Sequence, residues 1–153
     1  MKSRYDEFSS LILSINKSIQ RIKNFEMESF GLKGNQVQCI YHLYNEEGGI
    51  TPTQLSLLCG EDKGAMSRTI KELEKGDYLY IEEVGKQKYR NPIKLTQRGK
   101  ELGQMVSERV DEIFKEGSNG VEEEDRKDFY RLLSLVEGNL QEICKRYGGK
   151  NGN

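Results

Sequence analysis

The sequence predicts a mainly α-helical protein with one small β hairpin, an α+β chain, and three observations lead to this fold class. Apolar residues recur at spacings of three and four over long stretches, which is the period of amphipathic helices. Helix start and stop signals separate these stretches: Thr51 before Pro52 is a helix N-cap, and Gly60 ends the helix that follows. Residues 78–81 and 92–95 are strand-forming runs around a polar tip, which is typical of a hairpin.

The two terminal helices have the longest apolar stripes. In residues 5–30 the stripe consists of Phe8, Leu11, Ile12, Ile15, Ile19, Ile22 and Phe25, and in residues 122–147 of Phe129, Leu132, Leu133, Val136, Leu140, Ile143 and Tyr147. A single chain of this size covers such stripes poorly, so we expect the two helices to pack against each other and against a second copy. The predicted dimerisation residues are Phe8, Ile12, Ile15, Ile19, Leu133, Val136, Leu140 and Ile143.

Four more helices are expected between them. The helix over 34–46 turns Val37, Ile40, Tyr41 and either Leu43 or Tyr44 inward, and Gly48 and Gly49 stop it. Helices over 52–59 and 63–75, the latter burying Met66, Ile70 and Leu73, are joined by a tight glycine-containing turn, which predicts a helix-turn-helix. Thr96 caps a further helix, which residues 116–120 break.

The polar face of the 63–75 helix holds Gly64, Ser67, Arg68, Lys71 and Lys75 and no acid, and Lys63 stands at its start. Arg68 can fork onto a guanine edge or a phosphate, Ser67 can hydrogen-bond backbone or base, and Gly64 permits close approach. Lys71 and Lys75 suit phosphates. Taken alone, these residues are equally well explained by a solvent-exposed face on which lysines near the helix end interact favourably with the helix dipole.

A basic hairpin tip follows this helix directly. Lys86, Lys88 and Arg90 lie within five residues, and such a tip can reach a minor groove while the helix occupies the neighbouring major groove. By itself the tip is as well explained by charge that protects a sheet edge. Both basic features in this order favour DNA binding.

The charge distribution points the same way. The net charge is −1, but residues 51–100 hold ten Lys and Arg against seven Asp and Glu, a balance of +3 that leaves −4 for the rest. A local positive field gives phosphate attraction a direction that the net charge does not.

The ordered set of residues resembles the MarR family of bacterial transcription regulators. The matching positions are Leu32, Gln36, Ile40 and Leu43; Gly49, Ile50 and Thr51; Gln54, Leu55 and Ser56; Asp62 and Lys63; Ser67, Arg68, Thr69 and Ile70; Leu73 and Glu74; and Leu95, Thr96 and Gly99. The resemblance implies a winged helix-turn-helix homodimer, held by its long N- and C-terminal helices, that binds a pseudo-palindromic operator in double-stranded DNA. Such proteins usually repress transcription and are often released by a small anionic, phenolic or oxidising ligand.

Three positions depart from the family pattern. Lys33 stands where threonine is common, so the cap of the second helix must come from elsewhere. Asp77 stands where glycine is commoner, and Asp tolerates left-handed backbone moderately well. The wing lacks the usual acid-any-Arg motif, so the minor-groove role falls to Arg90, with Lys88 as its competitor.

Other candidate sites are weaker. The three cysteines are odd in number and widely spaced, which argues against a disulfide framework or zinc site. Cys39 could sense oxidants, as in some members of the family, but no adjacent basic residue lowers its pKa, and we expect all three cysteines to pack in the core. His42 is the single histidine, so a histidine metal site or a catalytic triad would lack the other residues it needs. We expect His42 to be a half-buried helix residue. The acidic run 122–125 suits the first turn of a helix.

We therefore expect one domain over residues 1–147, with a DNA-binding winged helix at 32–100, dimerisation helices at 1–31 and 101–147, and a disordered tail at 148–153. The expected function is sequence-specific binding of double-stranded DNA as a cytoplasmic homodimeric repressor, released by a small-molecule or oxidative signal. We expect no enzyme activity, because no nucleophile-base pair or phosphate loop appears, and we expect no cofactor or metal. We expect no membrane association, because no apolar run approaches the length of a bilayer span. The alternative is a winged-helix module that binds protein and not DNA.

Overall fold

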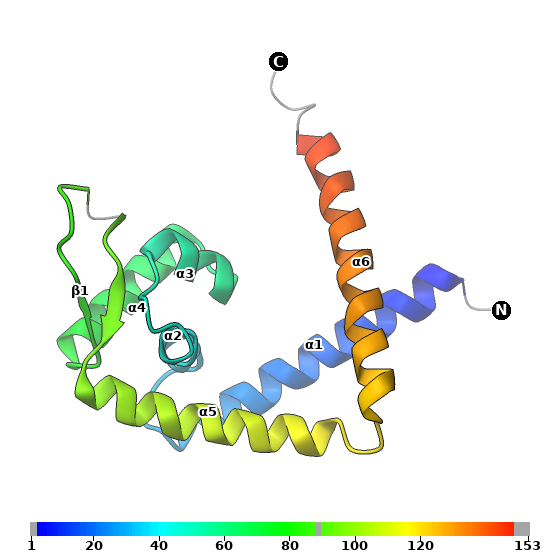
Figure 1. Ribbon diagram of the computed structural model, residues 1–153, viewed down its shortest axis with the longest axis horizontal. Helices are drawn as coiled ribbons and strands as arrows, with labels where there is room; N and C mark the ends of the chain where they lie inside the picture. The colour runs from blue at the N-terminus through cyan, green and yellow to red at the C-terminus, as the bar shows by residue number, and fades with distance from the viewer. Residues whose placement is uncertain (1–2, 88–89, 149–153) are drawn as a thin grey trace. The chain divides into compact units, whose positions relative to one another are not determined.

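The computed structural model describes residues 3–87 and 90–148 (Figure 1). The elements, in chain order, are α1 (Arg4–Glu28), α2 (Gly34–Tyr44), α3 (Pro52–Cys59), α4 (Lys63–Lys75), β1 (Leu79–Ile81), β2 (Ile93–Leu95), α5 (Gln97–Gly117) and α6 (Glu123–Gly148). Long helices with a small two-stranded sheet confirm the predicted fold class, a winged helix-turn-helix with long terminal helices. The chain divides into two compact units, Met1–Asp111 and Glu112–Asn153.

The helix-turn-helix is built by local capping. Thr51 Oγ1 accepts the backbone N–H of Gln54 at 3.3 Å, and the Asp62 carboxylate accepts that of Ala65 at 2.8 Å. Each bond satisfies an N–H that has no partner within its helix. Gly60 ends α3 with φ of 64°, a left-handed conformation that glycine adopts without a side-chain penalty. Both helices begin and end at the predicted residues.

The start of α2 shows where its cap comes from in the absence of threonine. The backbone N–H of Lys33 donates to Gln36 Oε1 at 3.0 Å, and the N–H of Gln36 donates to Asn35 Oδ1, also at 3.0 Å. The side chains of the first helical turn thus replace a capping hydroxyl. The helix ends at Tyr44, two residues before its predicted end, and the Asn45 amide donates to the Tyr41 carbonyl at 2.8 Å.

The sheet is a two-stranded antiparallel hairpin in which Leu79 faces Leu95 and Ile81 faces Ile93. Ile50, just before α3, extends it by a bridge: its N–H donates to the Ile93 carbonyl at 3.2 Å and its carbonyl accepts the Ile93 N–H at 2.8 Å. This bridge connects the base of the hairpin to the start of the helix-turn-helix.

One buried cluster joins these elements around α2, which Figure 1 shows end-on. Its members are Cys39, Ile40, Leu43, Ile50, Leu55, Met66, Ile70, Leu73, Leu79, Ile93 and Leu95. A second, smaller cluster of Met27, Val37 and Val106 connects α1 and α5 to α2. Arg109 on α5 adds a forked ion pair to Glu26 on α1, with N–O distances of 2.7 and 2.8 Å, which lowers the pKa of that carboxyl.

The terminal helices leave their apolar stripes uncovered. Met27 is the one residue of α1 that is buried, and α6 has none. The exposed side chains include Phe8, Ile12, Ile15, Ile19, Val136 and Leu140, whereas Leu133 and Ile143 are half-buried. Gly148, predicted to begin the disordered tail, is instead the last residue of α6, a position next to the helix end that glycine favours. Residues 149–153 lie outside the described residues.

Two further predictions concern single residues. His42 is half-buried as expected, and burial lowers its pKa. The prediction that all three cysteines pack in the core is right for Cys39, which is buried, but wrong for Cys144, which is exposed on a helix that buries nothing. None of the described helices has the length and apolar character needed to cross a membrane.

Gly99, in the first turn of α5, lies against the turn between α4 and β1. A Cβ placed on it would collide with the backbone carbonyl oxygen of Tyr78 and would lie 3.1 Å from Leu95 Cδ2. The Thr96 hydroxyl fixes this approach, because it accepts the Gly99 N–H at 3.0 Å and donates to the Asp77 carbonyl at 2.7 Å. The backbone of the α4–β1 turn cannot retreat without breaking these bonds.

We therefore expect Gly99→Ala to destabilise the protein by about 1 to 3 kcal/mol, the cost of overpacking a tight contact. At a helix position with free space beside it, Gly→Ala stabilises the folded protein by about 1 kcal/mol. Gly138→Ala in α6 is the matched control, because a Cβ there meets nothing within 4 Å. Thermal unfolding of the two variants checks this: Tm should fall for Gly99→Ala and not for Gly138→Ala, and equal shifts would contradict the close approach.

Candidate nucleic-acid interface

The recognition helix α4 has one buried and one exposed face. Met66, Thr69, Ile70 and Leu73 are buried, as the apolar spacing predicts for the three apolar members. The predicted DNA-binding residues of this helix, Lys63, Gly64, Ser67, Arg68, Lys71 and Lys75, are all exposed. The structure therefore places these six residues on the solvent side of one helix.

Hydrogen bonds from the first turn of α2 fix the rotation of α4 about its axis. Asn35 Nδ2 donates to Thr69 Oγ1 at 3.0 Å, and Gln36 Nε2 donates to the Glu72 carboxylate at 2.6 Å. Lys33 Nζ lies 3.6 Å from the same carboxylate. Because these bonds are directional, they decide which side of α4 faces outward more sharply than apolar packing does.

Glu72 is one of the acids that could weaken a positive surface on α4. Its carboxylate is turned toward α2, where Gln36 and Lys33 bind it. The negative charge of Glu72 is thus partly neutralised away from Arg68 and Lys71. Sequence reasoning did not identify this role for Asn35, Gln36 and Glu72; the one available signal was polar Thr69 within an apolar stripe.

Gly64 leaves room for Arg68 one turn later. A Cβ at Gly64 would lie 3.8 Å from Arg68 Nη1 and 3.2 Å from Asp62 Oδ1. The guanidinium of Arg68 therefore extends over the start of α4, beside the N-terminal turn that enters the major groove in helix-turn-helix proteins. A larger residue at position 64 would compete with Arg68 for this space.

The base of the wing is rigidly built. Asp77 takes the left-handed conformation, with φ of 60°, at the position where glycine is commoner in the resembled family. The Arg98 guanidinium stacks 4.4 Å from the centre of the Tyr78 ring and its Nη2 donates to the Tyr78 hydroxyl at 3.0 Å. These contacts join the end of α4, the hairpin and the start of α5.

The wing tip carries the remaining predicted residues. Lys86 and Arg90 are exposed, and the Arg90 N–H donates to the Gln87 carbonyl at 3.0 Å. Asn91 is buried beneath the tip and donates to the Gly85 carbonyl at 3.3 Å. Lys88, the competitor of Arg90 for the minor groove, lies outside the described residues.

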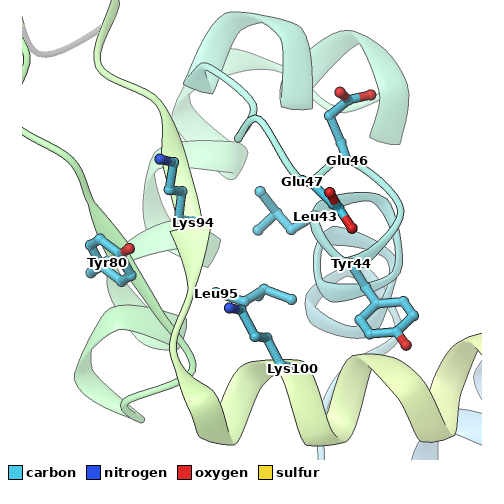
Figure 2. A pocket seen from close by; sticks show the side chains of 8 residues that line it. All are labelled: Leu43, Tyr44, Glu46, Glu47, Tyr80, Lys94, Leu95 and Lys100. Carbon is cyan, nitrogen blue, oxygen red and sulfur yellow. The ribbon is translucent and has the colours of Figure 1, made fainter.

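A pocket of about 250 Å³ lies apart from this surface, between the end of α2, β2 and the start of α5 (Figure 2). Its lining includes the carboxylates of Glu46 and Glu47 and the ammonium groups of Lys94 and Lys100. Lys94 is ion-paired with Glu82 at 2.8 Å, which raises its pKa. Both signs of charge line the pocket, so it has no net preference for an anion.

Side chains that bind metals are dispersed over the described part of the chain. Among them, no three His, Cys, Asp or Glu side chains come together in a group that could hold a metal ion. The acidic residues Glu123, Glu124 and Asp125 form the first turn of α6, where Glu123 is paired with Arg126. This arrangement agrees with their predicted role at a helix start.

Comparison with known proteins supports the sequence resemblance. Residues 30–88 match the model of the MarR family. Solved structures with the same fold include the transcriptional regulator PA3341, which is 16% identical, with 88% of this chain and 98% of that chain covered and a TM-score of 0.80. MepR of Staphylococcus aureus in a complex with DNA is 19% identical, with 87% of this chain and 97% of that chain covered and a TM-score of 0.73. A third is Staphylococcus aureus MarR in complex with salicylate and kanamycin, which is 16% identical, with 89% of this chain and 91% of that chain covered and a TM-score of 0.74. None of the curated proteins compared with the chain matches it.

The family match covers α2, the helix-turn-helix and β1, and it ends at residue 88, before Arg90 and β2. Two of the solved structures with this fold, PA3341 and SlyA, are described as transcriptional regulators. The matched segment and the shared fold agree with the resemblance drawn from the sequence: residues 30–88 match the MarR family model, and the chain has the fold of solved transcriptional regulators.

Proposed function

We propose that the chain binds double-stranded DNA sequence-specifically and represses transcription. The observation that carries this proposal is the outward face of α4, where Lys63, Gly64, Ser67, Arg68, Lys71 and Lys75 are all exposed while Glu72 is turned toward α2. Ser67 and Arg68, near the start of the helix, contact base edges in this proposal, and Lys71 and Lys75 contact phosphates. Arg90 or Lys88 reaches the adjacent minor groove.

DNA binding by a protein of this fold gives independent support. MepR of Staphylococcus aureus was solved as a DNA complex, and this chain superposes on it with a TM-score of 0.73. Phosphate contacts position such a protein on the duplex, and side chains at base edges supply the specificity. The exposed side chains of α4 provide both kinds of group.

The proposed active form is a cytoplasmic homodimer. The stripes of α1 and α6, which include Phe8, Ile12, Ile15, Ile19, Leu133, Val136, Leu140 and Ile143, are exposed or half-buried in the single chain. Exposed apolar surface of this extent marks an interaction site. A two-fold dimer would present two α4 helices to successive major grooves, about 34 Å apart, on a pseudo-palindromic operator.

A small-molecule or oxidative signal releases the DNA in this proposal. Staphylococcus aureus MarR, which shares the fold, was solved with salicylate and kanamycin. An effector that changes the spacing of the two α4 helices needs a coupling free energy of only about 1 to 3 kcal/mol to change DNA affinity about 5- to 150-fold.

A protein-binding module is the second candidate function. Leu57 and Leu58 on α3 are 78% and 50% exposed, which gives the helix-turn-helix an apolar surface beside its basic one. Binding to fragmented genomic DNA that weakens steeply with salt supports the regulator, because phosphate contacts release counterions. No binding at low salt would favour the module.

Arg68→Ala tests base contact. We expect the variant to lose about 1 to 3 kcal/mol of binding free energy for the operator, which is the discrimination of a good bidentate base contact. Operator fragments are first enriched from random DNA with the unaltered protein, and fluorescence anisotropy then compares the two proteins on operator and scrambled DNA. The loss should be larger on the operator; an equal loss on both would assign Arg68 to phosphate.

Lys71→Ala tests phosphate contact. The variant should weaken binding to operator and scrambled DNA alike and reduce the slope of log affinity against log salt by about 0.9, the value for one lost contact. Lys127→Ala, on exposed α6 and outside the proposed surface, is the matched control. An unchanged slope, together with unchanged binding by Arg68→Ala, would remove α4 from the DNA interface.

The mass of the protein in solution tests the dimer. Size-exclusion chromatography with light scattering should give about twice the chain mass of 17.6 kDa. Ile12→Asp and Ile15→Asp together should shift the mass toward the monomer, because they place charge in an apolar interface. Ser10→Asp, at an exposed position outside the apolar stripe, serves as the control. A stable monomer of the unaltered chain would contradict the role given to α1 and α6.

A further inference from the structure

Two cysteines far apart in the sequence touch inside the winged helix. Cys39 lies on α2 and Cys59 is the last residue of α3, and their Sγ atoms are 3.7 Å apart. The Cys39 Sγ also lies 3.7 Å from the Sδ of Met66 on α4. Three sulfur atoms thus meet where α2, α3 and α4 join.

The two thiols differ in access to solvent. Cys39 is completely buried, whereas Cys59 is half-buried and is followed by Gly60, at which an added Cβ would meet nothing within 4 Å. Cys59 is therefore the more accessible of the two to a small reagent from solution. This is the arrangement of a thiol that reacts first and a neighbour that resolves the product.

The thiol contact itself supports the same order. The hydrogen-bond contact between the two thiols lowers the pKa of Cys59 and raises that of Cys39. Lys23 acts on both thiols in the lowering direction and Glu61 in the raising direction. The thiolate, which is the reactive form, therefore forms first at the accessible sulfur.

We propose that Cys39 and Cys59 form a reversible disulfide within one chain, with hydrogen peroxide or an organic hydroperoxide as the oxidant. The Cys59 thiolate attacks the peroxide oxygen, the O–O bond breaks, and Cys59 becomes a sulfenic acid as water, or the alcohol of an organic peroxide, leaves. The Cys39 sulfur then attacks Cys59 Sγ, the S–O bond breaks, and the hydroxyl leaves with the Cys39 proton as water. Two thiols are oxidised by two electrons and one peroxide is reduced.

Closing the bond requires a movement in the helix-turn-helix. An S–S bond is about 2.05 Å long, so the sulfur atoms must approach by roughly 1.7 Å from their present contact. Rotation of the side chains supplies part of this approach, and the C-terminal turn of α3 supplies the rest. That turn is held to the α3–α4 connection by Ser56 Oγ, which donates to the Glu61 carbonyl at 3.1 Å.

The movement reaches the recognition helix because Met66 of α4 packs on the same sulfur. Protein cores are close-packed, so a shift of α3 against Cys39 displaces neighbouring side chains. The consequence for DNA rests on the proposed function: the disulfide weakens DNA binding by changing the position of α4 relative to α2. Disulfide formation itself is independent of that function.

The test uses the full chain with Cys144→Ala, which removes the one exposed thiol among the three cysteines. After hydrogen peroxide, intact mass should fall by two hydrogen atoms and return after dithiothreitol. Cleavage after Glu46 and Glu47 separates the two cysteines, so their fragments should stay linked until reduction. The matched control is the same chain with Cys59→Ser, which should show neither change.

DNA binding is measured in parallel by anisotropy with fragmented genomic DNA. We expect the oxidised protein to bind about 5-fold or more weakly than the reduced protein, and the Cys59→Ser control to be unaffected by peroxide. Sulfinic acid at Cys59 without linked fragments would overturn the proposed pair. Linked fragments with equal DNA affinity of the oxidised and reduced proteins would overturn the proposed effect of the disulfide on DNA binding. Reduced protein that binds no DNA would contradict the proposed function, whereas the mass measurements would still test the disulfide by themselves.

Discussion

The orientation of α4 depends on the two hydrogen bonds from α2, Asn35 to Thr69 and Gln36 to Glu72. Met66, Ile70 and Leu73 decide which face of α4 is buried, and the two hydrogen bonds add contacts that depend on direction. A hydrogen bond weakens steeply when its angle changes, and an unsatisfied buried partner costs about 1 to 3 kcal/mol. These bonds therefore hold Arg68 and Lys71 outward, and the other parts of the surface are arranged around that fixed face.

Much of the fold could be predicted from the sequence because its signals are local. The bounds of α3 follow from the Thr51 cap, from Pro52 at the first helical position and from Gly60 at the end, all of which act within a few residues. The outward basic face of α4 follows from helical spacing alone. The left-handed turn at Asp77 is instead expected from the family resemblance, because glycine is commoner at that position.

The remaining features required knowledge of which helices meet. Gln36 and Glu72 are ordinary surface residues by their sequence context, and only packing of α2 against α4 makes them partners. Cys39 and Cys59 are separated by 20 positions, and neither neighbourhood indicates that the two sulfur atoms touch. Cys144 was misjudged for the opposite reason: apolar neighbours on α6 suggest burial, but no described residue of that helix is buried.

The crowding at Gly99 has a mechanical consequence. Since the backbone of α5 rests on the carbonyl of Tyr78, and Arg98 stacks on the ring of the same residue, α5 cannot roll about its axis without moving the turn that ends α4. The first turn of α5 and the base of the wing are thus coupled through these two contacts. A rotation of the first turn of α5 would therefore act on the turn that ends α4 at one point, where the absence of a single carbon atom allows the close contact.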